Sequence, residues 1–120
     1  MGAGLPEAEV RDLVVDPTSP ARLFAATEAG LYRSADSGGT WSRVGPELED
    51  VEAVAVDRAK GTVFAGTFDG AFRSADGGAT WAPMGEGLAN TDVRALAVGG
   101  NPPRLWAGLA GGSVASIELP

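Results

Sequence analysis

The chain has 120 residues, of which 44% are hydrophobic and 21% charged, a balance typical of one folded domain rather than of a disordered segment. Sixteen acidic residues against nine basic ones give a net charge of −7, with no Lys/Arg cluster, so we expect no nucleic acid partner. Because the sequence contains neither Cys nor His, it excludes disulfides, thiol chemistry and imidazole bases, together with the usual zinc and haem sites.

The sequence carries no common membrane or targeting signal. No apolar run reaches the ~18 residues of a transmembrane helix, so we expect no membrane partner. The first ten residues, MGAGLPEAEV, lack the basic segment followed by an apolar segment that marks a secretory signal peptide. The chain as encoded is therefore expected in the cytoplasm.

Residues 10–50 predict four short strands, which we name A to D in chain order. Apolar stretches alternate with turns rich in Gly, Pro, Asp and Ser, and none of the stretches has helical spacing. The four stretches are VRDLVVD from Val10, RLFAATEAG from Arg22, LYRSAD from Leu31 and GTWSRVG from Gly39.

The same order of stretches returns in residues 51–92 and 93–120. The second unit opens with VEAVAVD at 51 and the third with VRALAVG at 93, so the spacing is 41 and then 42 residues. The third unit continues with RLWAGLAGG and SVASIE, which predict strands B and C, and no strand D follows. Residues 1–9 align without gaps on 84–92, so we interpret them as the end of a preceding unit.

A period of about 40 residues with four strands is typical of a β-propeller blade. Strand A supports this interpretation because it is apolar on both faces, with Leu13 and Val15 on one and Val10 and Val14 on the other. We therefore predict an all-β fold of about three four-stranded antiparallel blades, the third without its last strand. Because propellers typically have about four to eight blades, we expect copies of the chain to close the ring, with a homodimer of six blades favoured.

One motif occurs at the same place in the first two units. It reads S-x-D-x-G-x-T-W, and we call its two copies the motif turns; they comprise Ser34, Asp36, Gly38, Thr40 and Trp41, then Ser74, Asp76, Gly78, Thr80 and Trp81. The motif resembles the Asp-box of the bacterial neuraminidase repeat family of propellers, which includes sialidases, sortilin-type receptors and photosystem II assembly factors. The resemblance implies a turn between strands C and D, and related repeats are often exported.

The residue types fit a structural turn. An Asp side chain accepts hydrogen bonds from turn N–H groups, Gly permits unusual backbone angles, and Trp packs between blades. The alternative is that Asp36 and Asp76 bind a metal or form a catalytic pair. A cation needs several convergent oxygens, whereas each turn offers one carboxylate and a Ser, so we expect no metal and no cofactor.

Sialidases use an Arg triad, a Tyr–Glu pair and an acidic Asp, and none of these residues transfers to a position here. Tyr32, the single tyrosine, aligns with Phe72 and Val114, which predicts a core position. The densest acidic stretch, PELEDVE with Glu47, Glu49, Asp50 and Glu52, lies on a connection between units. A solvated loop is favoured there over the paired carboxylates of a glycosidase. We expect no catalytic residues.

The connections D–A and B–C share one end of a propeller, where we expect a ligand. Candidate residues at this end are Arg11, Glu52 and Arg94, the second residue of strand A in each unit, with Phe68 and Asp69 and the loops 45–50 and 85–92. The alternatives are that the Arg and Glu side chains satisfy each other as neighbours, and that Phe68 packs at the edge of its blade.

Three functions remain open from the sequence. The leading hypothesis is a non-catalytic Asp-box propeller module that acts as a protein- or glycan-binding scaffold. The second is an accessory or degenerate piece of a sialidase- or glycosidase-like propeller. The third is an architectural assembly unit without a ligand.

Overall fold

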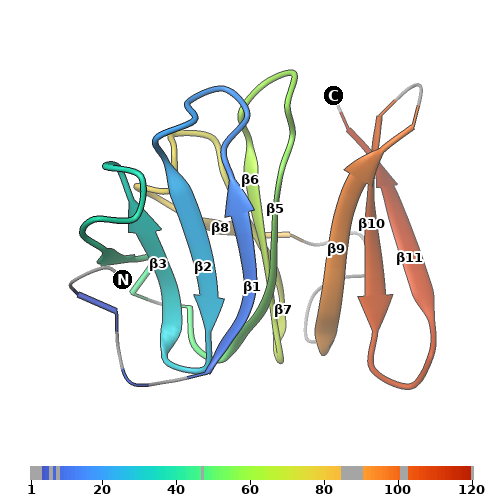
Figure 1. Ribbon diagram of the computed structural model, residues 1–120. Coiled ribbons are helices and arrows are strands. Elements are labelled where there is room, and N and C mark those ends of the chain that lie inside the picture. Colours follow the sequence, from blue (N-terminus) through green and yellow to red (C-terminus); the bar gives the residue numbers. More distant parts are fainter. Residues whose placement is uncertain are drawn as a thin grey trace.

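The computed structural model describes residues 4–5, 7, 9–46, 48–84, 91–100 and 103–119, and these contain strands and turns only (Figure 1). They form three antiparallel sheets in chain order. The first sheet comprises β1 (Val10–Val15), β2 (Leu23–Thr27), β3 (Gly30–Ser34) and β4 (Ser42–Val44). The second comprises β5 (Val51–Val56), β6 (Val63–Thr67), β7 (Gly70–Ser74) and β8 (Ala82–Pro83), and the third β9 (Val93–Gly99), β10 (Arg104–Leu109) and β11 (Val114–Glu118).

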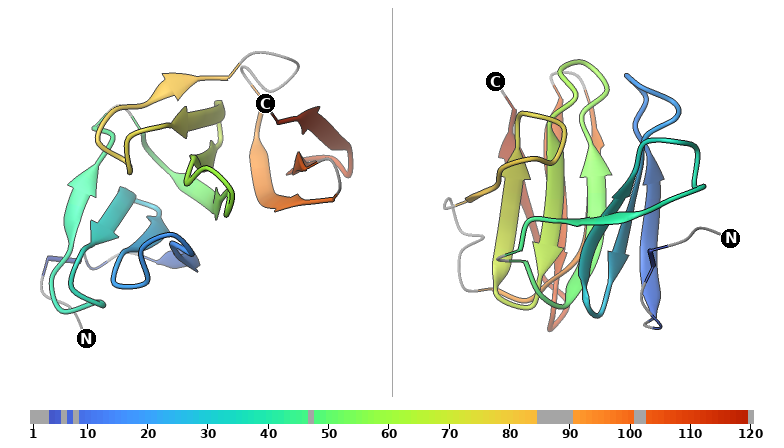
Figure 2. Two further views of the ribbon diagram at one scale, coloured as in Figure 1. Left: turned by 90° about the horizontal axis from the view of Figure 1, so that it is seen from above. Right: turned by 90° about the vertical axis from the view of Figure 1, so that its left-hand side faces the viewer.

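The sheets follow one another around an arc when seen along their strands (Figure 2, left). Their first strands are neighbours in series, because β1 contacts β5 and β5 contacts β9. This arrangement confirms the predicted all-β fold of blade-like sheets, and β11 forms an edge of the third sheet. Within the described ranges no helix is long and apolar enough to cross a membrane.

The hairpins between the second and third strands differ in length between sheets. In the first two sheets a two-residue turn joins the strands, and a Thr hydroxyl closes it, with Thr27 Oγ1 donating to Gly30 O at 2.8 Å. In the third sheet the Leu109 N–H donates to Ser113 O across a three-residue loop. The extra residue shifts β11, so that Ala115, and not Val114, lies opposite Ala107.

This shift corrects the alignment made from sequence. Tyr32 lies opposite Ala25 and Phe72 opposite Ala65, so their counterpart in the third sheet is Ala115. By the same register Ile117, opposite Leu105 as Ser74 is opposite Val63, occupies the place of the first Ser of the motif. The motif turn therefore has no partial copy in β11.

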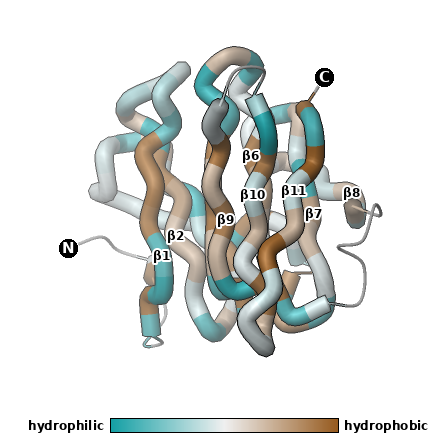
Figure 3. The backbone as a smooth tube through the Cα atoms, turned by 90° about the vertical axis from the view of Figure 1, so that its right-hand side faces the viewer, coloured by the Kyte–Doolittle hydropathy of each residue, from teal (hydrophilic) through white to brown (hydrophobic). Residues whose placement is uncertain are grey.

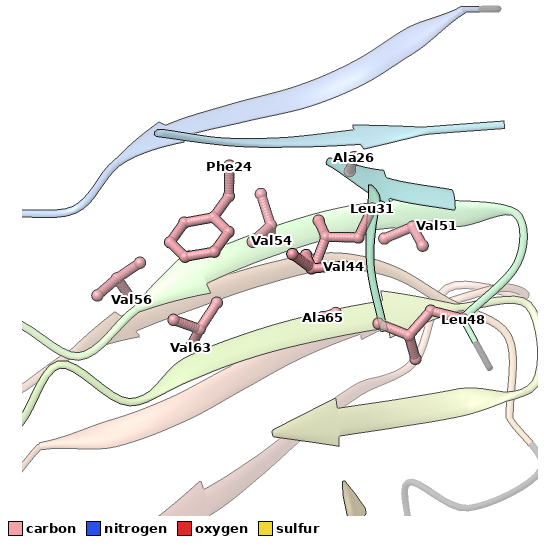
Figure 4. Close-up of a cluster of buried hydrophobic side chains, with 10 residues drawn as sticks. All are labelled: Phe24, Ala26, Leu31, Val44, Leu48, Val51, Val54, Val56, Val63 and Ala65. Atoms are coloured by element: carbon pink, nitrogen blue, oxygen red, sulfur yellow. The ribbon is translucent and has the colours of Figure 1, made fainter. Parts of the chain in front are cut away.

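Two hydrophobic cores lie between successive sheets. The first, between sheets one and two, contains Phe24, Ala26, Leu31, Val44, Leu48, Val51, Val54, Val56, Val63 and Ala65 (Figure 4). The second, between sheets two and three, contains Phe64, Ala71, Met84, Val93, Leu105, Ala107 and Ile117. Each fully buried Val, Leu or Phe contributes about 1.5–3 kcal/mol, so the contacts between sheets, rather than any one sheet, stabilise the fold.

The outer faces of the two end sheets are open, as is expected of three blades that do not close a ring. Leu13 and Val15 are 55% and 50% exposed, whereas their counterparts Val54 and Val56 in β5 are 3% and 9% exposed. On the third sheet Val114 is 70% exposed. Figure 3 shows hydrophobic stretches along β9 and β11 from that side.

Candidate functional site

The first motif turn is a closed hydrogen-bond network between β3 and β4. Ser34 Oγ donates to Asp36 Oδ1 at 2.8 Å and accepts the Gly38 N–H at 2.8 Å. Asp36 accepts the Thr40 N–H at 2.8 Å on Oδ1 and the Thr40 hydroxyl at 2.7 Å on Oδ2. Trp41 Nε1 donates to Gly38 O at 3.2 Å, and Gly38 has a φ of 94°. Each polar side chain of the motif thus has a partner within the turn.

The second motif turn repeats this network between β7 and β8. Ser74 Oγ donates to Asp76 Oδ1 at 2.7 Å and accepts the Gly78 N–H at 2.9 Å. Asp76 Oδ1 accepts the Thr80 N–H at 2.9 Å, and Trp81 Nε1 donates to Gly78 O at 2.9 Å. The two turns are therefore chemically equivalent.

These hydrogen bonds hold both carboxylates in their ionised form. The bond from the Thr40 N–H, then those from the Thr40 and Ser34 hydroxyls, lower the pKa of Asp36 to about 2. Bonds from the Thr80 hydroxyl and N–H keep the pKa of Asp76 well below its usual range. A carboxylate engaged in this way is a poor proton donor at neutral pH. In the part of the chain that the structure describes, no group of three acidic residues is arranged to hold a metal ion.

The second turn is fixed against the first sheet. Arg33 Nη1 donates to Gly77 O at 2.8 Å, and the Arg22 guanidinium lies against Gly77 as well. Gly78 lies so close to the Phe24 ring that a Cβ there would be 2.9 Å from it, and Trp81 packs against the first core. The contacts of Arg22 and Arg33 were not predicted, because they depend on which sheet lies beside the turn.

The first turn lies on the outer side of the first sheet, where no described sheet precedes it. Trp41 is half-buried and belongs to neither core of the described residues. Gly4 approaches the Trp41 carbonyl so closely that a Cβ would be 2.2 Å from the oxygen. Gly45 lies against the Trp81 indole instead, where a Cβ would be 2.9 Å from Cδ1. The two motif turns thus have the same internal hydrogen bonds but different surroundings.

The opposite end of the sheets, where β1 and β5 begin, is at the bottom of Figure 1. Arg11, the second residue of β1, is surrounded by carboxylates. It forms a hydrogen-bonded ion pair with Asp50 and further ion pairs with Glu9 at 3.2 Å, Glu52 at 3.5 Å and Glu28 at 3.9 Å. The hydrogen bonds that Arg11 donates to Asp50 and Glu9 raise the pKa of Arg11 above its usual value. Asp50 has a φ of 51°, a left-handed conformation that is costly for a residue with a side chain.

Arg94 takes a different partner from the other two residues of the expected polar ring. Its guanidinium binds Asp92 at 3.1 Å, and this bond raises the pKa of Arg94. The second carboxylate oxygen of Asp92, Oδ1, is buried without a partner among the described residues. Of the three residues of the expected polar ring, Glu52 thus pairs with Arg11, whereas Arg94 pairs with Asp92 and is largely exposed.

Phe68, a candidate ligand residue, is 54% exposed at the tip of the β6–β7 turn, which speaks against the alternative that it packs at the edge of its blade. It borders a shallow hollow of about 210 Å³ that is lined by Glu49, Thr67, Phe68, Asp69 and Phe72. Of the other predicted loop residues, Glu47 and 85–90 lie outside the described residues.

Asp12 is a structural residue that sequence reasoning missed. Its Oδ2 accepts the Val54 N–H at 3.1 Å and so joins β1 to β5 across two sheets. A β-bulge in β1 between Val10 and Asp12 accompanies this contact. The available signal was a carboxylate at a position where the next two units have Ala53 and Ala95.

Solved structures with this arrangement of sheets are propellers and propeller enzymes. An ancestral GH74 enzyme matches with a TM-score of 0.78 and 19% identity over 97% of this chain and 18% of its own. The GH74 xyloglucanase from Xanthomonas campestris matches with a TM-score of 0.72 and 23% identity over 92% of this chain and 21% of its own. A structure of YCF48 bound to a D1 peptide matches with a TM-score of 0.55 and 20% identity over 97% of this chain and 37% of its own. These likenesses establish the propeller fold.

Among curated proteins, a xyloglucanase of Hypocrea jecorina (strain QM6a) is 33% identical over 52 residues. The match covers 43% of this chain and 6% of the xyloglucanase. No family model matches the sequence. The chain thus spans a small part of the proteins that it resembles.

Proposed function

We propose that the chain is a non-catalytic propeller module of the Asp-box type that binds a ligand through the end that carries Arg11, Glu52, Arg94, Phe68 and Asp69. The motif turns support a structural role for the boxes, because the hydroxyls and N–H groups of each turn occupy the carboxylate of its own Asp. Because the polar side chains of the motif turns are already bonded within the turns, we place ligand recognition at the opposite end of the sheets.

The exposed Phe68 carries this proposal. An exposed aromatic ring beside a hollow is a typical anchor point for a partner. Glu49 and Asp69 line the same hollow and add negative charge to it. Of the two ligand classes that the sequence leaves open, protein and glycan, this combination favours a polypeptide segment with basic and aromatic side chains, since carboxylates pair with Arg or Lys and the ring binds cations on its face.

The test is calorimetric titration of the chain with a panel of short basic–aromatic peptides. We expect Phe68→Ala and Asp69→Asn each to weaken binding about tenfold, as for residues of a small interface. Glu7→Gln, an exposed carboxylate that does not line the hollow, is the matched control and should bind like the wild type. Equal binding by all variants, or no binding by any peptide, would contradict the proposal.

The second candidate is an accessory or degenerate piece of a glycosidase-like propeller. The 33% identity with a xyloglucanase over 52 residues favours it, and its ligand would be a glycan. Xyloglucan oligosaccharides added to the chain distinguish the candidates: release of reducing ends that is lost in Glu52→Gln would establish an enzyme. Binding without hydrolysis would support the accessory piece. If the chain neither hydrolyses nor binds these oligosaccharides, the peptide-binding module stays the favoured function.

We also propose that two copies of the chain associate to form a six-bladed ring. Trp106 is the counterpart of Phe24 and Phe64, against which the next sheet packs, yet it is 43% exposed. Leu13 and Val15 correspond to the residues of β5 that cover the preceding sheet. The outer faces of the third and first sheets are therefore complementary, so that one copy would cover the open face of the other.

A further inference from the structure

The cavity between β7 and β11 has a counterpart elsewhere in the molecule that is already filled. Its volume is about 460 Å³, and it is lined by Asp57, Lys60, Thr62, Phe64, Arg73, Ala75, Met84, Ile117, Glu118 and Leu119. We name it the β7–β11 cavity. It lies at the end of the sheets where the motif turns lie, away from the polar face around Arg11, and the proposed function does not use it.

The register identifies what fills the corresponding place one sheet earlier. Phe64 is the counterpart of Phe24, because each lies opposite an Arg of the third strand, Arg73 and Arg33. On the first sheet these positions are covered by the second motif turn: Gly78 lies against Phe24, and Arg33 donates to Gly77 O.

The apolar contacts agree with the polar ones. Trp81 packs against the first core, which contains Val44 at the end of β4, and Met84, beyond β8, occupies the equivalent place in the second core. Met84 and Phe64 both line the β7–β11 cavity. The residues that would hold a third Trp and its turn are therefore in place, while β11 supplies Ile117 where the motif has Ser.

The edge of the third sheet offers the remaining part of the site. In the first sheet β4 pairs with β3 through Leu31, Tyr32 and Arg33. In the third sheet β11 is the edge strand, so its outward N–H and C=O groups are available to an added strand. Cavity and edge lie side by side, because Ile117 and Glu118 belong to both.

We propose that the β7–β11 cavity and the edge of β11 together bind a Trp-bearing motif turn and the strand that follows it, supplied by another polypeptide. The Trp enters between Phe64 and Met84, the strand pairs with β11, and Arg73 donates to a backbone carbonyl of the turn as Arg33 does to Gly77. Binding completes the third sheet and covers the apolar residues that line the cavity.

The probe is a synthetic peptide with the sequence of residues 35–45, ADSGGTWSRVG, which carries the turn and a strand without proline. Calorimetry with the intact chain should give a saturable 1:1 complex, and the same peptide with Ala in place of its Trp should bind about a hundredfold more weakly. In the chain, Arg73→Ala should weaken binding about fivefold, the equivalent of one lost hydrogen bond of ~1 kcal/mol. Arg58→Ala, an exposed Arg outside the cavity, is the control.

Amide chemical shifts locate the bound peptide. We expect changes at Phe64, Met84 and 114–118, and none at the polar face around Arg11. Equal binding of the Trp and Ala peptides would mean that the edge takes any strand, and this would overturn the proposal. Changes confined to the open face of β1, or no binding at all, would overturn it as well. Because the Trp→Ala change is made in the peptide, these outcomes are independent of the folding of the chain.

Discussion

Replacement of the two motif tryptophans separates the hydrogen bonds of the turn from its contact with a neighbouring sheet. Both indoles donate to a Gly carbonyl of their own turn, but only Trp81 packs against a core of the described residues. Trp81→Ala removes that apolar contact and leaves a cavity beside Phe24, so we expect the free energy of unfolding to fall by about 3–5 kcal/mol. Trp41→Ala loses its indole hydrogen bond and partial burial, and we expect a loss of ~1 kcal/mol.

Urea denaturation followed by far-ultraviolet circular dichroism measures both losses without relying on tryptophan fluorescence. Samples are diluted until light scattering gives the mass of a single chain, because association of copies would bury Trp41 as well. Equal losses for Trp41→Ala and Trp81→Ala in single chains would refute the reasoning that contact with the preceding sheet, and not the turn itself, gives the second Trp its importance.

Three further results are expected. Because the folded pKa of Asp36 is about 2 against a usual 3.8, the unfolded chain binds more protons between these values. Stability should therefore be constant above pH ~5 and fall from pH ~4 to ~2; urea midpoints that fall just as much over this range in the Asp36→Asn, Asp76→Asn variant would contradict the assignment. Calcium, magnesium and zinc should leave the melting temperature unchanged, since each motif carboxylate is already bonded; a shift of several degrees at micromolar metal would show a site. Light scattering at micromolar concentration should give twice the mass of one chain, and Leu13→Asp should give the mass of one; a stable single chain in the wild type would end the six-blade proposal.

The strands and their order could be predicted because they depend on local patterns. Alternating apolar residues and turns with Gly and Pro act over a few residues, and the same local patterns return after about 41 residues. Each observed strand lies within a predicted stretch, except that β3 and β7 begin one residue earlier, at Gly30 and Gly70. The bonds of Asp36 within its own turn are equally local. Sequence spacing alone was sufficient for such features.

Contacts between sheets could not be predicted in the same way. The bond from the Val54 N–H to Asp12 and the attachment of Arg33 to the next turn both depend on which sheet lies beside which. The predicted alignment of β11 was wrong for another reason. One extra residue in a Gly-rich loop moves every later residue to the opposite face of the sheet. The sequence left open whether Phe68 is exposed or packed, because a hairpin tip has no periodicity that indicates burial.

The position of the two cores between sheets, rather than within them, determines how this architecture changes with the number of repeats. Three sheets in an open row share two cores, one at each junction. A row therefore always has one junction fewer than it has sheets, and each added repeat contributes one new core and leaves the number of open faces unchanged. Only closure makes the two numbers equal, so the gain from the last junction belongs to the whole assembly and to no single repeat.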